Sequence, residues 1–237
     1  MLSIVIPAFN EEKNVSKCLD ALCRQSTDQK FEVILVDNNS TDNTVGMAKE
    51  FSEKLNLKIV KQEKKGRSPA RKKGFDVARG EIIFSTDADI VVPYNWIHEM
   101  VSCFEDENIV AVTGRCYIDD CNWLTNKIFN TFHPLAMHLY RVFFGHYWLN
   151  GFSFAVRASV YTKSGGFDSE LNVQEDVDLA IKLSKLGKIE FLGKAPVHFS
   201  GRRFNQHGLL KGLWPYLKSF RFYRQGNKAE AYLSDVR

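Results

Sequence analysis

Short apolar runs alternate with amphipathic stretches along the first half of the chain. Apolar runs of this length are typical of strands that are buried on both faces of a parallel sheet. We expect strands at residues 2–6, 31–36, 57–60, 81–84 and 109–113. The stretches between them repeat apolar residues at helical spacing, which favours helices. This alternation predicts βαβ units and an α/β fold with a mostly parallel sheet.

Proline and asparagine residues predict where some of these elements begin and end. Pro7 is expected to stop the first strand, and Asn10 is expected to cap a helix that opens at residues 10–12. Residues 123–148 are rich in aromatic side chains, and Pro134 divides them into an expected pair of helices packed on the sheet. The alternative for this region is an apolar patch that binds an acceptor or faces a membrane.

Two carboxylates, Asp87 and Asp89, follow the apolar run at residues 81–84. If the chain stays extended, both point to the same side, where their charges repel each other. A divalent cation would remove this penalty, because hard oxygen ligands suit Mg²⁺ or Mn²⁺. The alternative is an ordinary polar turn, since Asp is common where strands end.

Polar residues also follow two other strands, at residues 7–11 and at Asp37. In open parallel sheets, ligands bind beyond the carboxyl ends of the strands. Three strands therefore direct polar or acidic groups to one edge, which predicts a ligand site there. No G-x-G-x-x-G follows the first strand, so a dinucleotide-binding fold of the usual type is disfavoured.

Composition adds bounds on the class of protein. The chain has 237 residues, of which 44% are hydrophobic and 25% charged, as is ordinary for a soluble globular protein. The five cysteines are odd in number, include no C-x-x-C, and follow no signal peptide, so we expect reduced thiols and a cytoplasmic location. No uncharged apolar window is long enough to span a membrane.

The charge is uneven, because residues 198–237 hold eight Lys or Arg against two Asp or Glu. Such a tail predicts an anionic partner, for example a phosphate, a lipid head group or an acidic membrane face. Residues 209–224 mix basic and aromatic side chains. This mixture is typical of a helix that lies on a membrane surface, where it would admit a lipid-linked acceptor. Folding back over the cleft is the alternative. Nucleic acid is disfavoured as a partner, since no recognised binding module is present.

Four segments, residues 5–11, 36–44, 65–67 and 87–89, together resemble glycosyltransferase family 2. The resemblance implies the GT-A fold, a Rossmann-like, mostly parallel sheet flanked by helices, with a fused acceptor-binding part. It implies a donor-binding half at residues 1–114. Residues 115–237 would carry the acceptor site and the catalytic base, within a single fused domain.

The same resemblance implies a nucleotide-sugar site with Mn²⁺ or Mg²⁺ as cofactor. Its expected donor-binding residues are Pro7, Ala8, Asn10, Glu11, Asp37, Arg67, Asp87, Ala88 and Asp89. Glu11 and Asp37 would contact the ribose and base, and Arg67 would lie near the base or phosphate. Asp89 would ligate the cation, with Asp87 near the ribose or the metal. Asn38 departs from the pattern, because many members have a second Asp there.

The second half resembles the family at residues 150–157, 165–168 and 174–179. Asp176 matches the general base of the family, which takes a proton from the acceptor hydroxyl. The expected acceptor-side residues are Asn150, Gly151 and Glu175, although the local sequence also favours a structural role for Glu175. His198 is either a further metal or phosphate ligand or a surface histidine. Arg202 and Arg203 would contact the diphosphate, or would be solvated arginines.

The implied activity is inverting transfer from a nucleoside-diphosphate sugar, with UDP favoured, to an acceptor hydroxyl. The acceptor would be lipid-linked or a growing cell-envelope polysaccharide, and the enzyme would be cytoplasmic or peripheral at the membrane. One alternative is a non-catalytic protein that binds a sugar nucleotide or a membrane surface. The other is a nucleotidyltransferase, which the lack of a Gly-rich triphosphate loop near the first strand disfavours.

Overall fold

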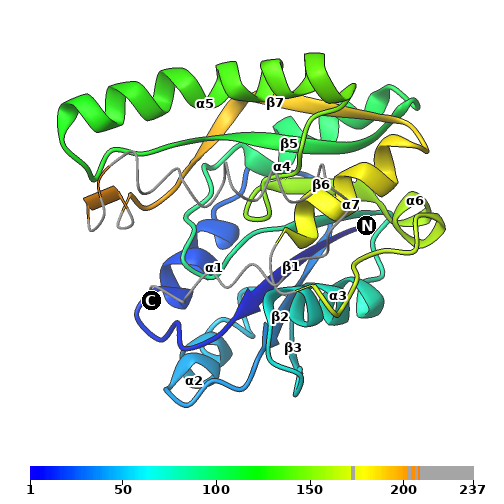
Figure 1. Cartoon of the computed structure of the whole chain (residues 1–237). Coiled ribbons are helices and arrows are strands. Elements are labelled where there is room, and N and C mark those ends of the chain that lie inside the picture. Colours follow the sequence, from blue (N-terminus) through cyan, green and yellow to red (C-terminus); the bar gives the residue numbers. More distant parts are fainter. Residues whose placement is uncertain (172–173, 202–203, 206–207, 209–237) are drawn as a thin grey trace.

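The computed structural model describes residues 1–171, 174–201, 204–205 and 208 (Figure 1). Its strands are β1 (Leu2–Ala8), β2 (Phe31–Asp37), β3 (Leu57–Lys61), β4 (Ile82–Ser85), β5 (Ile109–Tyr117), β6 (Phe154–Arg157) and β7 (Lys188–His198). Its helices are α1 (Val15–Cys23), α2 (Thr44–Lys49), α3 (Arg67–Val77), α4 (Trp96–Ser102), α5 (Trp123–Phe144), α6 (Ala158–Lys163) and α7 (Glu175–Ser184), with a short 3₁₀ turn at Cys103–Glu105. The α/β class predicted from the apolar runs is confirmed.

All seven strands form one sheet in the order β3-β2-β1-β4-β6-β5-β7. The pairs among β1 to β4 are parallel, as is β5 with β7, whereas β6 runs antiparallel to both of its neighbours. The strand β6, from the second half of the chain, thus completes the sheet next to β4. Residue 114, the expected end of the donor-binding half, lies inside β5.

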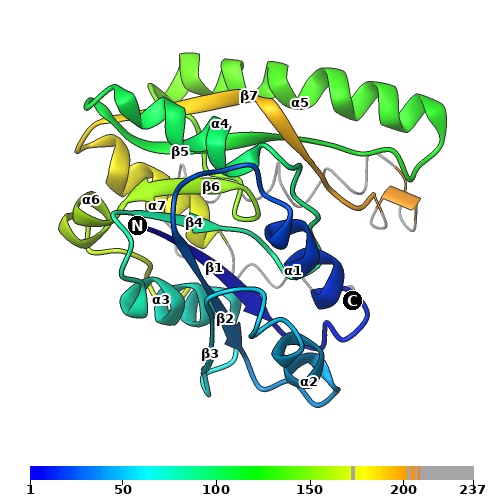
Figure 2. The same ribbon diagram turned by 180° about the vertical axis from the view of Figure 1, so that it is seen from behind.

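Helices cover both faces of the sheet (Figures 1 and 2). On one face, β1 packs through Ile4 and Ile6 against α1, α2 and α4. On the other, Val5 and Ile34 pack against α3, α6 and α7. This division follows from the strand repeat, in which alternate side chains point to opposite faces. The helix α5 lies beside β5 and β7, at the opposite end of the sheet from β3.

Two predicted boundaries near the first strand are wrong. Pro7 does not stop β1, which pairs with β2 as far as Ala8. Pro7 is tolerated because β4 pairs with β1 only up to Val5, so the missing N–H is not needed on that side. Asn10 does not cap a helix, since it has a positive φ of 55° and α1 begins only at Val15. Its side chain accepts a hydrogen bond from the Thr41 amide instead, at 2.8 Å.

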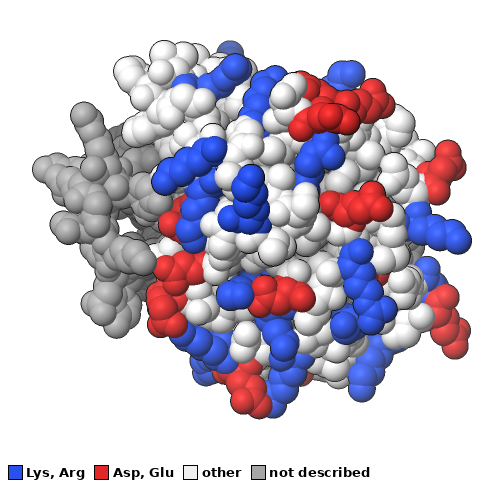
Figure 3. Space-filling view, turned by 90° about the vertical axis from the view of Figure 1, so that its right-hand side faces the viewer, with Lys and Arg blue, Asp and Glu red and all other residues white. Residues whose placement is uncertain are grey.

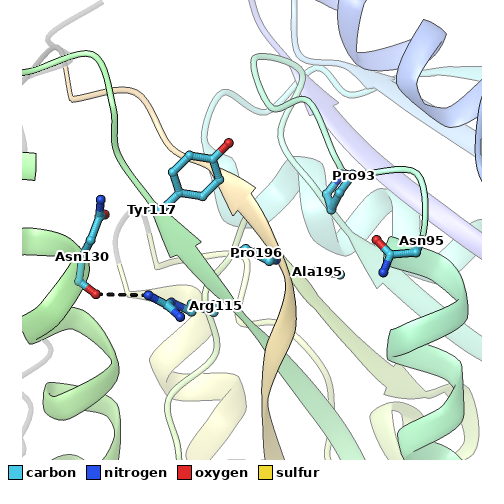
Figure 4. A pocket seen from close by; sticks show the side chains of 7 residues that line it. All are labelled: Pro93, Asn95, Arg115, Tyr117, Asn130, Ala195 and Pro196. Atoms are coloured by element: carbon cyan, nitrogen blue, oxygen red, sulfur yellow. Dashed lines mark hydrogen bonds between the residues drawn. The ribbon is translucent and has the colours of Figure 1, made fainter.

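The expected helix pair around Pro134 is a single helix, α5, which contains that proline. Proline normally disrupts a helix because it has no N–H for the carbonyl four residues earlier. That carbonyl belongs to Asn130, and it accepts a hydrogen bond from Arg115 Nη2 on β5 at 3.3 Å (Figure 4). A tertiary contact therefore replaces the bond that Pro134 removes, and α5 continues.

The five cysteines are free thiols, as expected. Among the described helices, none combines the length and the apolar character needed to cross a membrane.

Candidate active site

The loops after β1 and β2 form one hydrogen-bonded unit at the carboxyl edge of the sheet. The Asn10 amide donates to Ser40 Oγ at 3.1 Å, and the Glu11 amide donates to Thr44 Oγ1 at 2.7 Å. Asp37 Oδ1 accepts from the Ser40 amide at 3.1 Å, which closes a turn after β2. The expected nucleoside-binding residues Glu11 and Asp37 thus belong to two loops that are linked to each other.

Asn38, the residue that departs from the family pattern, links the loop after β3 to this edge. Its buried side-chain amide donates to the carbonyls of Gln62 and Lys64 at 2.9 and 2.8 Å, and its Oδ1 accepts from the Gly66 amide at 2.8 Å. A carboxylate cannot make the two donor bonds. Asn38 therefore fixes the turn that precedes Arg67, the first residue of α3.

The negative charges of three carboxylates from two loops act on the buried thiol of Cys18. Burial, and then the negative charges of Asp89, Asp87 and Glu11, raise the pKa of this thiol far above its usual range. The thiol lies 3.5 Å from the Asp87 carbonyl. The structure thus brings Glu11, after β1, together with Asp87 and Asp89, after β4. Such a concentration of negative charge fits a hard divalent cation.

A buried guanidinium, Arg71 on α3, joins this acidic group to α7. Its Nη2 lies 2.7 Å from Asp87 Oδ1, and its Nη1 hydrogen-bonds to Glu175 Oε1. The side chains of Arg71 and Glu175 are only 4% and 5% exposed. Burial lowers the pKa of Arg71, but the charges of Asp87, Glu175 and Asp176 raise it above its ordinary value, so the guanidinium stays charged.

Asp176 lies in the first turn of α7 and is half-buried. Its Oδ2 accepts from the Gly151 amide at 3.0 Å, and its Oδ1 accepts from the Val177 amide at 2.9 Å. Burial and then the neighbouring Glu175 raise the pKa of Asp176 to about 7, while Arg71 and the two amides act in the opposite direction. A carboxylate with such a pKa is suited to accept a proton near neutral pH.

Asn150 and Gly151 connect β5 to Asp176. The buried Asn150 side chain donates to the Gly114 carbonyl at 2.7 Å and accepts from Trp148 Nε1 at 2.9 Å. A Cβ on Gly151 would lie 2.8 Å from Arg71 Nη2, so only glycine fits beside the guanidinium. Asn150 is therefore fixed in place, and the next residue, Gly151, directs its amide to Asp176 and leaves room for Arg71. Their expected acceptor contacts, and that of Glu175, stay predictions.

His198 belongs to a different group of residues. Its Nε2 lies 2.6 Å from Asp119 Oδ1, and its ring meets that of Tyr117 edge-on. One potential ligand atom from each of Asp119, Asp120 and His198 lies within 4.8 Å of the others. Within the described ranges, Glu11, Asp87 and Asp89 do not form such a three-residue group, either with one another or with His198.

A pocket near this group is separate from the expected donor residues. A pocket of about 550 Å³ lies between β5, β7 and α5, and Figure 4 shows its lining residues Pro93, Asn95, Arg115, Tyr117, Asn130, Ala195 and Pro196. None of these is an expected site residue. Arg202, Arg203 and the tail at residues 209–224 lie outside the described residues.

Sequence reasoning missed Arg71 and Cys18. Arg71 is 104 residues from Glu175 along the chain, and Cys18 is 69 residues from Asp87. No local spacing pattern marks such partners. The sequence contains one signal for Arg71, which is its position inside a helix that packs on the sheet. A basic side chain that is buried at such a position needs an anionic partner.

Comparison with known proteins places the chain in a family. The model described as "Glycosyl transferase family 2" matches residues 3–164. That match covers more than half of the chain, and the chain therefore belongs to this family. The probable glycosyltransferase YdaM of Bacillus subtilis is 31% identical over 78% of this chain and 47% of its own length. The putative glycosyltransferase EpsH of the same organism is 25% identical over 99% of this chain and 72% of its own length.

Solved structures show the GT-A fold. TarS of S. aureus in complex with UDP superimposes with a TM-score of 0.69 at 19% identity, over 84% of this chain and 60% of its own. The mannosyltransferase PcManGT of Pyrobaculum calidifontis, in complex with GDP-Man and Mn²⁺, gives 0.69 at 21% identity, over 92% and 64%. The chain spans 38% of the glycosyltransferase AglE of Haloferax volcanii and, as stated, under half of YdaM.

Proposed function

We propose that the protein transfers a sugar from a nucleoside-diphosphate sugar to an acceptor hydroxyl with inversion at the anomeric carbon. The observation that carries this proposal is the Arg71 bridge, in which one buried cation contacts Asp87 on the donor side and Glu175 beside Asp176. A donor near Asp87 and Asp89 and an acceptor near Asp176 would then meet across a short distance. Family membership supports the same reaction class.

The donor would lie along the carboxyl edge of β1, β2 and β4. Glu11 and Asp37 would contact its nucleoside, and Pro7, Ala8, Asn10 and Ala88 would shape that site. Arg67 would face the base or phosphate. UDP is our first choice of nucleotide, supported by the UDP-GlcNAc bound in a TarS structure, although PcManGT binds GDP-Man. Nucleotide release from UDP- and GDP-sugars distinguishes the two nucleotides.

Asp89 and Asp87 would hold Mn²⁺ or Mg²⁺. The chemistry of these residues fits, because carboxylate oxygens suit both ions and the charges of Asp89, Asp87 and Glu11 all act on the nearby Cys18. Since Arg71 bonds to Asp87 Oδ1, we assign the main ligand role to Asp89. A bound ion would supply charge neutralisation for the diphosphate that leaves. PcManGT, the structural neighbour described above, has Mn²⁺ bound together with its donor.

Asp176 would act as the general base. As the acceptor oxygen bonds to the anomeric carbon, its proton passes to an Asp176 carboxylate oxygen. The bond from the anomeric carbon to the diphosphate oxygen breaks, and its electron pair leaves with the nucleoside diphosphate. Attack from the face opposite the leaving group inverts the configuration. The Gly151 and Val177 amides hold the carboxylate in one orientation for this transfer.

The acceptor would approach from the side of Gly151 and Glu175. We propose a lipid-linked sugar or a growing polysaccharide as its class. Asn150 would shape this side indirectly, because its side-chain amide already bonds to Gly114 and Trp148.

The test is nucleotide release from a panel of UDP-, GDP- and dTDP-sugars in the presence of Mn²⁺, Mg²⁺ or EDTA. We expect slow release from one donor, dependent on metal. Donor binding without release under any condition would favour the non-catalytic alternative, and absence of both release and donor binding would contradict the proposed transfer. Release of pyrophosphate from a nucleoside triphosphate and a sugar phosphate would instead favour the nucleotidyltransferase.

A further inference from the structure

The helix α5 carries most of the large apolar side chains that the described residues expose to solvent. Eight of the eleven belong to this one helix. They are Trp123, Leu124, Phe132, Leu135, Leu139, Val142, Phe143 and Phe144, with exposed fractions between 47% and 77%. Scattered exposed apolar residues need no explanation, but a contiguous group of this kind marks an interaction surface.

These residues follow the helical repeat. Spacings of three or four residues relate Phe132, Leu135, Leu139 and Val142, which places them along one side of the helix. Met137 and Tyr140, on the opposite side, are buried against the rest of the protein. The helix is therefore apolar on both sides, and packing against the rest of the described protein explains only the inner side. At 22 residues it extends about 33 Å, which makes the outer stripe long and narrow.

The charges on α5 have one sign. Residues 123–144 contain no Asp or Glu, whereas Lys127 and Arg141 lie near the two ends, and both are exposed. Lys127 Nζ lies 5.0 Å from the centre of the Trp123 ring, and Arg141 Nη1 donates to the Tyr147 hydroxyl at 3.2 Å. Acidic and basic side chains are interspersed on the face drawn in Figure 3, so a lack of acidic residues is not a general property of the surface of the protein.

We propose that the outer stripe of α5 binds the surface of an anionic phospholipid bilayer. An apolar stripe with aromatic residues at its ends would enter the boundary between head groups and acyl chains. Lys127 would then reach anionic head groups, where an acidic residue would be repelled, whereas Arg141, four residues after Met137, is held on the inner side by Tyr147. A bilayer accepts such a long stripe without a complementary shape, whereas a protein partner needs a packed patch with a polar rim.

This placement would bring the acceptor side of the site close to the bilayer. The inner side of α5 meets Trp148 through Tyr140, with ring centroids 5.1 Å apart, and Trp148 donates to Asn150. The Gly151 amide, next in the chain, holds Asp176. One helix thickness, about 10 Å, followed by Trp148 and Asn150, therefore separates the stripe from the residues around the proposed base. Binding itself does not rest on the proposed transfer reaction, so the two are tested separately.

The test is co-sedimentation of the full chain with vesicles, without donor or acceptor. Two vesicle types are compared, pure phosphatidylcholine and phosphatidylcholine with about one third phosphatidylglycerol. We expect binding to the anionic vesicles that weakens as salt is added. The double variant Val142→Glu/Phe143→Glu should lower the partition coefficient by about tenfold or more, because it places charge on the apolar side. Tyr94→Glu, an exposed residue outside α5, is the matched control and should bind as wild type does.

Folding of the double variant is checked by its thermal midpoint, and Val142→Glu alone serves as a milder change. Unchanged vesicle binding by both variants would overturn the proposal and would assign any binding to another part of the chain, such as residues 209–237. Equal binding to both vesicle types would overturn the role of Lys127. Absence of binding, with a wild-type dimer that the variants convert to monomer, would overturn it in favour of a second copy of the chain.

Discussion

Removing the guanidinium of Arg71 should destabilise the protein strongly. Arg71→Met keeps an unbranched side chain of similar length but leaves the buried Glu175 carboxylate without its cation. Two unit charges about 4 Å apart attract by about 4 kcal/mol at an effective dielectric constant near 20. Removing one partner of a buried pair costs about 3–5 kcal/mol in general. We therefore expect the free energy of unfolding to fall by about 3–5 kcal/mol.

The assay is urea unfolding, followed by the shift of the midpoint at constant slope. In a chain of this size, the same loss lowers the melting temperature by about 2–4 °C for each kcal/mol. Arg79→Met is the matched control, since Arg79 is exposed, and should change stability by no more than about 0.5 kcal/mol. The double variant Arg71→Met/Glu175→Met removes both charges and should recover about 2 kcal/mol or more of the loss.

A loss of less than about 1 kcal/mol in Arg71→Met would refute this reasoning, because it would mean that Glu175 is not held as a buried charge. Additive effects of the two substitutions would refute the pairing between Arg71 and Glu175, even if each single variant were unstable.

Three further predictions concern the site. Asn38→Asp should lower the free energy of unfolding by about 2–4 kcal/mol in urea titrations, because it removes two buried donor bonds and sets a carboxylate against two carbonyls; Asn56→Asp, at an exposed position before β3, is the control, and equal stability of the two variants would contradict the role of Asn38. Asp89→Ala should weaken Mn²⁺-supported donor binding by about tenfold or more in calorimetry, while Asp119→Ala should not; the reverse result would move the metal site to the group around His198. Nucleotide release should fall as pH drops through about 7, because Asp176 must be deprotonated to act as a base, and a rate that is flat from pH 5 to 8 would exclude this.

The raised pKa of Asp176 also has a consequence for stability. Its folded-state pKa, about 7, exceeds the ordinary value of 3.8. Between these values the folded chain binds more protons at this residue than the unfolded chain, so the stability contributed by the group is lost as pH rises through this window. The stability of Asp176→Asn relative to wild type should therefore be higher at pH 8 than near pH 4, as measured by urea unfolding at the two pH values.

The strands and the acidic edge were predictable from the sequence because their signals are local. The runs at residues 31–36 and 81–84 are apolar at nearly every position, as required of strands buried on both faces. Asp37, Asp87 and Asp89 follow such runs directly, and topology brings strand ends to one edge.

The errors and omissions arose where distant residues decide the outcome. Considered with its neighbours in sequence, Pro134 predicts a helix boundary. Arg115, nineteen positions earlier, instead donates the missing hydrogen bond to the Asn130 carbonyl. Asn38 reads as a weakened nucleotide contact, but its amide holds the turn before Arg67. His198 was a candidate ligand for the acidic edge, but the pairing of β7 with β5, which sets His198 opposite Tyr117, places it beside Asp119.

The measurement that tests the proposed function most directly compares Asp176→Asn with Asp178→Asn. Both substitutions fall in the first turn of α7 and remove one negative charge. Donor binding is measured by calorimetry, and nucleotide release is measured with the donor and metal that the panel identifies. We predict that Asp176→Asn binds the donor as wild type does but releases nucleotide about 10²- to 10⁴-fold more slowly, while Asp178→Asn retains both properties. Release at the wild-type rate by Asp176→Asn would contradict the assignment of Asp176 as the general base.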